Sequence, residues 1–296
     1  MTASQIFKSS SLPLIESEIL IAFLLGKNKE FLLTHPETEI TPAVYKKFRL
    51  LEHKRQAGWS SAFLVGQKEF YGLDFKVDKN VLIPRPETEL MVDEVLDILR
   101  QSANDLMLID LGTGSGAIII ACADQIKKVF PDKYKDIIFR AIDISSSALK
   151  IAKKNAVLNK QEKNINFLLG NLLEPLVNKV DFSNLSQREL VIAANLPYLT
   201  LKQVKASPSI QKEPELALVA GSDGLKYYRE LFRQMKSLKK ILASKNNSVK
   251  PITVLCEIDP SQNKSLKLLV KKYFPSVNLE IKKDLASRDR LAIIKI

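Results

Sequence analysis

The sequence predicts an α/β fold built on a doubly wound, mostly parallel sheet, and three observations support it. From about residue 87 onward, short apolar runs typical of buried strands alternate with longer stretches of helical periodicity. Three of the first four runs end at a polar side chain, namely Asp110, Asp143 and Asn195. The last two strands have little sequence between them, which predicts one antiparallel strand near the end of the chain.

The strands and helices of this sheet are assigned from apolar runs and helical spacing. The predicted strands cover residues 106–109, 137–142, 165–169, 189–194, 252–258, 277–281 and 291–296. The predicted helices cover residues 87–101, 226–243 and 261–273, and two further helices end near Lys128 and Asn159. We expect this part of the chain, residues 89–296, to form one domain.

A smaller helical domain is predicted over residues 1–70, followed by a hairpin connector over residues 71–88. Residues 17–25 carry an apolar stripe at helical spacing, and Thr41-Pro42 opens a helix that continues to Gln56. Between Phe70 and Ile83, apolar residues surround Gly72 and the pair Lys79-Asn80, which predicts two short strands with a turn.

Composition and charge limit the functional classes. The chain has 296 residues and a formal net charge of +12, which is compatible with nucleic acid, the ribosome or an acidic protein as a partner, or with lysines scattered over solvated faces. Cys122 and Cys256 lie in separate apolar runs and are expected to be reduced core residues. Neither a signal peptide nor a membrane span is recognisable, so we expect a soluble, cytoplasmic protein. His35 and His53 lack neighbouring ligands, and no metal site is expected.

The clearest local pattern is the stretch from Leu108 to Gly116, in which a buried strand leads into three alternating glycines and then a helix. Glycine is needed where the backbone turns tightly or lies directly against a ligand. The spacing differs from that of dinucleotide-binding loops, and no Gly-Lys-Ser/Thr follows, which disfavours another kind of nucleotide loop. Asp143, at the end of the next strand, is placed to accept hydrogen bonds from both hydroxyls of a ribose.

The tetrapeptide Asn195-Leu196-Pro197-Tyr198 follows the fourth strand at the same edge of the sheet. An amide or exocyclic amino nitrogen is a poor nucleophile, because its lone pair is delocalised. The Asn195 side-chain oxygen and the Leu196 carbonyl can accept both N–H bonds of such a group, while Pro197 fixes the direction of that carbonyl and Tyr198 can stack on the planar group. A simple strand-ending turn is the alternative explanation.

The glycine loop and Asp143 resemble the S-adenosylmethionine site of Rossmann-like class I methyltransferases. This resemblance implies that S-adenosylmethionine is the cofactor, and it implies a contact set that includes Leu172 near the adenine. The implied cofactor-binding residues are Asp110, Gly112, Thr113, Gly114, Ser115, Gly116, Asp143, Leu172 and Asn195. The tetrapeptide resembles the Asn-Pro-Pro-Tyr motif of amino and amide methyltransferases, with Leu196 replacing the first proline. It also resembles the motif of ribosomal RNA adenine dimethyltransferases.

Further segments resemble the peptide-chain release factor glutamine methyltransferases. They are Gly66–Gly72, Ile83–Glu89, Glu213–Leu218, Gly221–Leu225, Glu257-Ile258 with Gln262, Asp284-Leu285 and Asp289-Arg290. The resemblance implies an enzyme that methylates the side-chain amide nitrogen of the glutamine in the Gly-Gly-Gln motif of class 1 peptide chain release factors, thereby tuning translation termination. Asn195, Leu196, Pro197 and Tyr198 would be catalytic and would bind substrate, and Arg85 and Glu87 would shape the substrate cleft. The helical domain would help to hold the release factor.

Two other functions stay open at this stage. An adenine amino-group methyltransferase acting on RNA or DNA is compatible with the charge and the tetrapeptide, although a nucleic-acid substrate would call for an aromatic-rich groove that the sequence does not show. A non-catalytic scaffold would have no use for the glycine loop, Asp143 and Asn195 together. The sequence therefore favours a methyltransferase with a protein substrate, no direct nucleic-acid substrate and no membrane partner.

Overall fold

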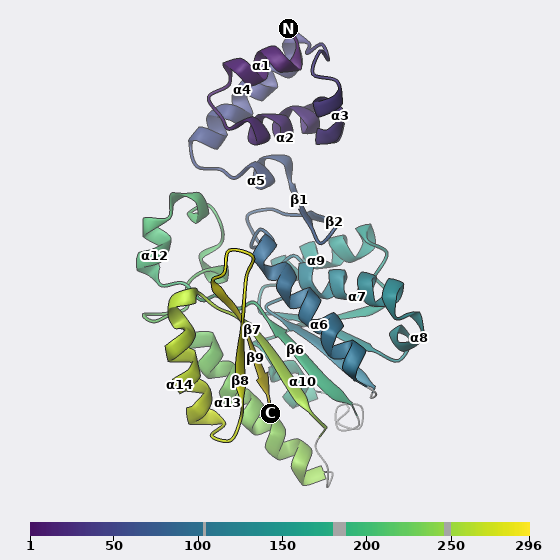
Figure 1. Cartoon of the computed structure of the whole chain (residues 1–296), viewed down its shortest axis with the longest axis vertical. Helices are drawn as coiled ribbons and strands as arrows, with labels where there is room; N and C mark the ends of the chain where they lie inside the picture. The colour runs from purple at the N-terminus through teal and green to yellow at the C-terminus, as the bar shows by residue number, and fades with distance from the viewer. Residues whose placement is uncertain (103–104, 180–187, 246–249) are drawn as a thin grey trace. The chain divides into compact units, whose positions relative to one another are not determined.

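A computed structural model describes residues 1–102, 105–179, 188–245 and 250–296 of the chain (Figure 1). The chain divides into two compact units. The first contains residues 1–67 and 205–212, and the second contains residues 68–204 and 213–296. No helix among the described residues is both long enough and apolar enough to cross a membrane.

The first unit is helical, and its core contains Leu20, Ile21 and Phe48. Its helices are α1 (Ala3–Ser9), α2 (Leu14–Leu25), α3 (Lys29–Thr34), α4 (Pro42–Gln56) and α5 (Ser61–Val65). The predicted start of α4 is confirmed, since Thr41 caps the helix by accepting a hydrogen bond from the Val44 N–H at 3.3 Å.

A two-stranded hairpin is confirmed, but it lies earlier than predicted. Its strands are β1 (Gln67–Phe70) and β2 (Leu73–Lys76). Tyr71 and Gly72 form the turn with φ values of 53° and 72°, and this left-handed pair is what a tight two-residue hairpin requires. Lys79 and Asn80, the other turn candidates, lie beyond the hairpin in a segment without strand structure.

The second unit is organised around a seven-stranded sheet with the order β5-β4-β3-β6-β7-β9-β8. Its strands are β3 (Leu106–Leu111), β4 (Ile138–Asp143), β5 (Ile165–Leu169), β6 (Glu189–Ala194), β7 (Ile252–Glu257), β8 (Leu279–Lys283) and β9 (Asp289–Lys295). The first five strands in this order are parallel, and β9 pairs antiparallel with both β7 and β8. The predicted α/β fold and its late antiparallel strand are confirmed.

Helices cover both faces of the sheet, which explains why strand residues that point to either face are buried (Figure 1). In β3, for example, Leu108 packs into one hydrophobic cluster and Ile109 into the other. One face is covered by α6 (Glu89–Gln101), α7 (Ala117–Val129) and α9 (Ser146–Leu158), with the short α8 (Pro131–Tyr134) after α7. The other face is covered by α10 (Glu174–Lys179), α13 (Lys226–Lys245) and α14 (Asn263–Tyr273). A short helix, α12 (Leu201–Ala206), lies between β6 and α13 in the chain.

The order of the strands in the sheet determines where a ligand site is expected. The chain passes from β3 to β4 on one side and later adds β6 on the other side of β3. Ligands bind in open α/β sheets at such a switch point, beyond the carboxyl ends of the strands. Asp110 lies one residue before the end of β3, Asp143 ends β4, and Asn195 directly follows β6, so all three lie at this edge.

The packing of α14 against the sheet can be tested with one helix and one type of substitution. Leu266 is fully buried, whereas Leu268 is 70% exposed. We expect Leu266→Ala to lower the free energy of unfolding by roughly 2–5 kcal/mol, because it leaves a cavity, and Leu268→Ala to change it by less than about 0.5 kcal/mol. Urea denaturation of both variants measures the difference, and equal effects would contradict this packing.

Candidate functional site

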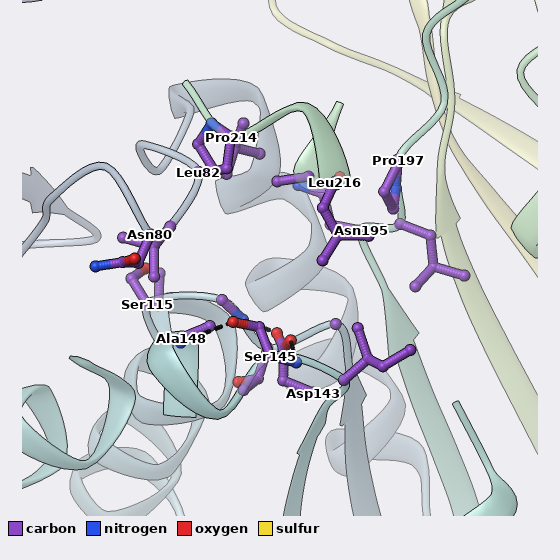
Figure 2. Close-up of a pocket in the computed structure, with 18 of the residues that line it drawn as sticks. Asn80, Leu82, Ser115, Asp143, Ser145, Ala148, Asn195, Pro197, Pro214 and Leu216 are labelled. Carbon is purple, nitrogen blue, oxygen red and sulfur yellow. Dashed lines mark hydrogen bonds between the residues drawn. The ribbon is translucent and has the colours of Figure 1, made fainter. Parts of the chain in front are cut away.

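A cavity of about 280 Å³ lies at the carboxyl edge of the sheet, within the second unit. Its walls come from the loops after β3, β4, β5 and β6, from residues 79–88 and from residues 214–217. In Figure 2, Asp143 lies below Asn195, and Leu82, Pro214 and Leu216 close the upper side of the view. The predicted site residues that line it are Arg85, Gly112, Thr113, Gly114, Ser115, Asp143, Leu172, Asn195, Leu196 and Pro197.

The glycine loop after β3 requires glycine for two physical reasons. Gly112, Gly114 and Gly116 all have positive φ values, of 68°, 56° and 82°. A Cβ atom on Gly116 would lie 2.8 Å from Ile120 Cδ1, and one on Gly112 would lie 3.2 Å from Leu196 Cδ2. The loop is therefore packed between α7 and the Asn195 loop, and its backbone is exposed to the cavity without side chains at the glycines.

Asp143 fixes the glycine loop and borders the cavity. One carboxylate oxygen, Oδ2, accepts the Gly114 N–H at 2.9 Å, and the other accepts the Ser145 N–H at 2.8 Å. Burial raises the pKa of Asp143, while these backbone hydrogen bonds act in the opposite direction. Each oxygen of an ionised carboxylate has more than one acceptor position, so Asp143 can still receive hydroxyl groups of a ligand.

Asp110 lies beneath the glycine loop and does not belong to the described residues that line the cavity. Its Oδ2 accepts the Thr113 hydroxyl at 2.6 Å, whereas Oδ1 is buried and has no hydrogen-bond partner among the residues that the structure describes. Burial raises the pKa of Asp110 to about 7. Its contact in this structure is with the loop and not with the cavity.

Leu172, for which an adenine contact is predicted, lines the cavity in the loop after β5. It has a φ of 53°, and its side chain is buried. The preceding Gly170 N–H donates to the Asp143 carbonyl at 3.0 Å, which ties this wall to the end of β4.

Asn195 is held by a chain of hydrogen bonds that leads to the buried Glu257 carboxylate. Its Nδ2 donates to the Thr88 hydroxyl at 3.1 Å, and that hydroxyl donates to Glu257 Oε2 at 2.6 Å. The Tyr198 hydroxyl donates to the other Glu257 oxygen at 3.0 Å. Burial and the neighbouring Glu257 carboxylate raise the pKa of Tyr198, so this phenol remains a donor.

Tyr198 is placed differently from the prediction. Its ring packs against the hydrophobic cluster beneath the sheet edge, its hydroxyl points to Glu257, and it is not among the described residues that line the cavity. Gln262 Nε2 donates to the Tyr198 carbonyl at 2.8 Å, and a Cβ on Gly224 would lie 2.1 Å from that carbonyl oxygen. The segment around Gly224 and Gln262, which the sequence related only to a family pattern, therefore fixes the Asn195–Tyr198 loop.

Arg85 and Glu87 have different surroundings. Arg85 lines the cavity and forms an ion pair with the buried Glu213, whose other oxygen accepts the Ile83 N–H at 3.1 Å. These contacts tie residues 83–85 to Glu213, which directly precedes the wall formed by residues 214–217. Glu87 lies outside the described lining and accepts a hydrogen bond from Arg288 at 3.3 Å.

Thr88 and Glu257 form the hydrogen-bond chain behind Asn195, and the sequence alone did not assign this place to either residue. Thr88 was present in the Arg-Pro-Glu-Thr-Glu segment, where early acids and proline also suit helix initiation. Glu257 was present in a segment that resembled the family. Nothing in the linear sequence indicates that these residues meet, because 169 positions separate them.

Two family models match the chain. One is described as the PrmC N-terminal domain and matches residues 1–66, and the other is described as a methyltransferase domain and matches residues 102–273. The fold is also similar to the crystal structure of the catalytic domain of human METTL16 in complex with an RNA hairpin, with a TM-score of 0.56 and 13% identity over 93% of this chain and 90% of that chain. A second similar structure is the N-terminal domain of human METTL16 in complex with SAH, with a TM-score of 0.51 and 14% identity over 93% of both chains.

Two curated relatives cover nearly all of the chain, and both are named release factor glutamine methyltransferase. The protein from Bacillus cereus is 32% identical over 94% of this chain and 91% of its own length. The protein from Dictyoglomus turgidum is 33% identical over 95% of this chain and 90% of its own length. The chain contains a methyltransferase domain over residues 102–273 and is an enzyme of that class. The glycine loop and Asn195 meet at one cavity, and the relatives match nearly the whole chain, so the chain belongs to the release factor glutamine methyltransferase family.

Proposed function

We propose that this enzyme transfers a methyl group to the side-chain amide nitrogen of the glutamine in the Gly-Gly-Gln motif of class 1 release factors. The observation that carries the proposal is the hydrogen-bonded placement of Asn195 at the cavity, beside the glycine loop. The names of the curated relatives support the identity of the substrate.

The cavity residues suit S-adenosylmethionine. The positive-φ glycines leave a bare backbone surface, and the buried Asp143 keeps acceptor positions for ribose hydroxyls. Leu172 and Ile144 add apolar surface for a planar base. We propose that Gly112, Thr113, Gly114, Ser115, Asp143 and Leu172 contact the cofactor directly, while Asp110 acts through Thr113 and Gly116 through the packing of the loop.

Asn195 provides one of two acceptors for the target amide. Because the Thr88 hydroxyl has a single proton and donates it to Glu257, it can only accept from Asn195. The Asn195 amide nitrogen is thereby occupied, which leaves Oδ1 as the group that Asn195 offers to the cavity. The Leu196 carbonyl is the second acceptor, and Pro197 restricts its direction.

The two acceptors make the amide nitrogen reactive. Bound S-adenosylmethionine supplies an electrophilic methyl group on a positively charged sulfur. Hydrogen bonds from both N–H groups to Asn195 Oδ1 and the Leu196 carbonyl localise the nitrogen lone pair and orient it. As the nitrogen takes the methyl group from the sulfur, one of its N–H protons would pass to water, so the main contribution of the protein is positioning.

The alternative of an adenine amino-group methyltransferase acting on RNA or DNA is not favoured. The curated relatives that span the chain are named for release factor glutamine methylation. The similarity to human METTL16 is at 13–14% identity and supports the fold alone.

The two predicted roles at the cavity can be separated by mutation. We expect Asn195→Ala to lower kcat by roughly 100-fold or more while cofactor affinity stays within about twofold, because Asn195 positions the amide. Asp143→Ala should chiefly weaken cofactor binding, by about tenfold or more, because a buried hydrogen-bonding carboxylate is lost. Isothermal titration calorimetry and steady-state kinetics give both values, and equal losses of cofactor affinity would contradict this division.

Thr88 is proposed as a positioning residue for Asn195. Thr88→Val keeps the shape of the side chain but removes both hydrogen bonds, so kcat should fall roughly 10- to 100-fold with unchanged cofactor affinity. Thr88→Ser restores the hydroxyl and should recover most of the activity. A purely structural role would instead lower the melting temperature in step with activity, and the fraction of enzyme that binds cofactor would fall as well.

The substrate is tested by transfer of a labelled methyl group. We expect label to enter a purified class 1 release factor, and to be lost when the glutamine of its Gly-Gly-Gln motif is replaced by alanine. Total RNA incubated in the same way should remain unlabelled. Transfer to RNA alone would contradict the proposed function and support adenine methylation.

A further inference from the structure

The positive charge of the chain is concentrated on two helices. Together α13 and α14 contain eleven Lys and Arg residues and one acidic residue, Glu230. Their net charge is therefore +10, compared with +12 for the whole chain, so all remaining residues together contribute +2. The lysines are not evenly scattered, as they would be if the charge reflected only composition.

The two helices form one surface. Both pack over the same face of the sheet through one hydrophobic cluster, and they lie side by side (Figure 1). Seven exposed lysines of this surface are here called the lysine face, and they are Lys236, Lys239 and Lys240 on α13 and Lys264, Lys267, Lys271 and Lys272 on α14. On α14 the spacing 264, 267 and 271 places three of them along one side of the helix.

The charge of the lysine face is not neutralised within the described structure. Glu230 is paired with Arg233, and Asp223 near the start of α13 is paired with Arg229. None of the seven lysines forms an ion pair with any described residue. A cluster of like charges opposes folding by self-repulsion, and a polyanion would relieve it.

The chemistry of the face favours a phosphate backbone over a protein. Protein interfaces bury a central apolar patch, but Leu268 is the sole large hydrophobic residue of α13 and α14 that is exposed in the described part of the chain. Binding to single strands relies on exposed aromatic side chains for stacking, and these helices present none that is fully exposed. A lysine cluster with one isolated leucine and no fully exposed aromatic side chain suits contacts to the phosphates of a double helix.

We propose that the lysine face binds double-stranded RNA through its phosphates, independently of sequence and of methyl transfer. DNA readers place a helix or ribbon in the wide major groove, whereas an A-form RNA duplex is bound mainly from its surface through phosphates and 2′-hydroxyls. Because α13 and α14 are packed flat on a sheet, they can contact a duplex from its surface but present no projecting element for a groove.

The proposal is tested on the full chain with a fluorescent RNA duplex of about 20 base pairs, by anisotropy at several salt concentrations and without cofactor. We expect binding that weakens as salt rises, and at least a tenfold loss in the triple variant Lys264→Glu, Lys267→Glu, Lys271→Glu, because three phosphate contacts are lost. The matched control is Lys150→Glu, Lys153→Glu, Lys154→Glu on α9, which reverses three exposed lysines of the same unit and should stay within about twofold.

Several outcomes would overturn the proposal. They are the absence of RNA binding at low salt, equal losses in the two triple variants, equal or tighter binding of a DNA duplex of the same length, and binding of an acidic polypeptide in place of RNA. Methyl transfer to a release factor is measured on the same variants and should be unchanged by the α14 substitutions. A failure of RNA binding is therefore distinguishable from a failure of the proposed enzymatic function.

Discussion

The site depends on the parallel, in-register alignment of β3, β4 and β6. Asp110 of β3 is opposite Ala141 of β4 and Ala193 of β6, so the three strands end at nearly the same level. Helices cover both faces, and the strand interiors are consequently apolar. Polar side chains can reach water or a ligand only where the strands end, and Asp143 and Asn195 lie at these ends.

The cofactor loop and the reactive loop are packed against one another. Leu196 lies against Gly112, so the residue that replaces a proline of the related motif also defines how close the two loops come. On the far side, Gly224 and Gln262 fix the Tyr198 carbonyl. The direction of the Leu196 carbonyl is thus constrained by tertiary contacts as well as by Pro197, which explains how the loop can be ordered with a single proline.

The sequence predicted the sheet well because buried parallel strands are short apolar runs, and β6 was predicted with its observed bounds. It located the hairpin only approximately, since a positive φ at Tyr71 cannot be recognised from the residue type. It predicted a site at the glycine loop, Asp143 and Asn195, which the structure brings together at one cavity, but it did not indicate which residues orient them. Thr88 and Asn195 are 107 residues apart, and their contact exists only because η1 (Pro86–Thr88) and the end of β6 meet at one edge.

The positive charge looked dispersed in the sequence for the same reason, because the residues that carry it come together only in the folded structure. The basic residues of α13 and α14 are separated by β7 and its flanking loops, so no single window contains them all. Packing on one sheet face joins them into one surface. Tyr227, at the start of α13, lines the cavity, and α14 follows the turn that contains Gln262, which holds the Tyr198 carbonyl, so both basic helices begin close to the cavity. None of the seven lysines is among the described residues that line the cavity, so the basic surface and the cavity use different side chains of the same elements.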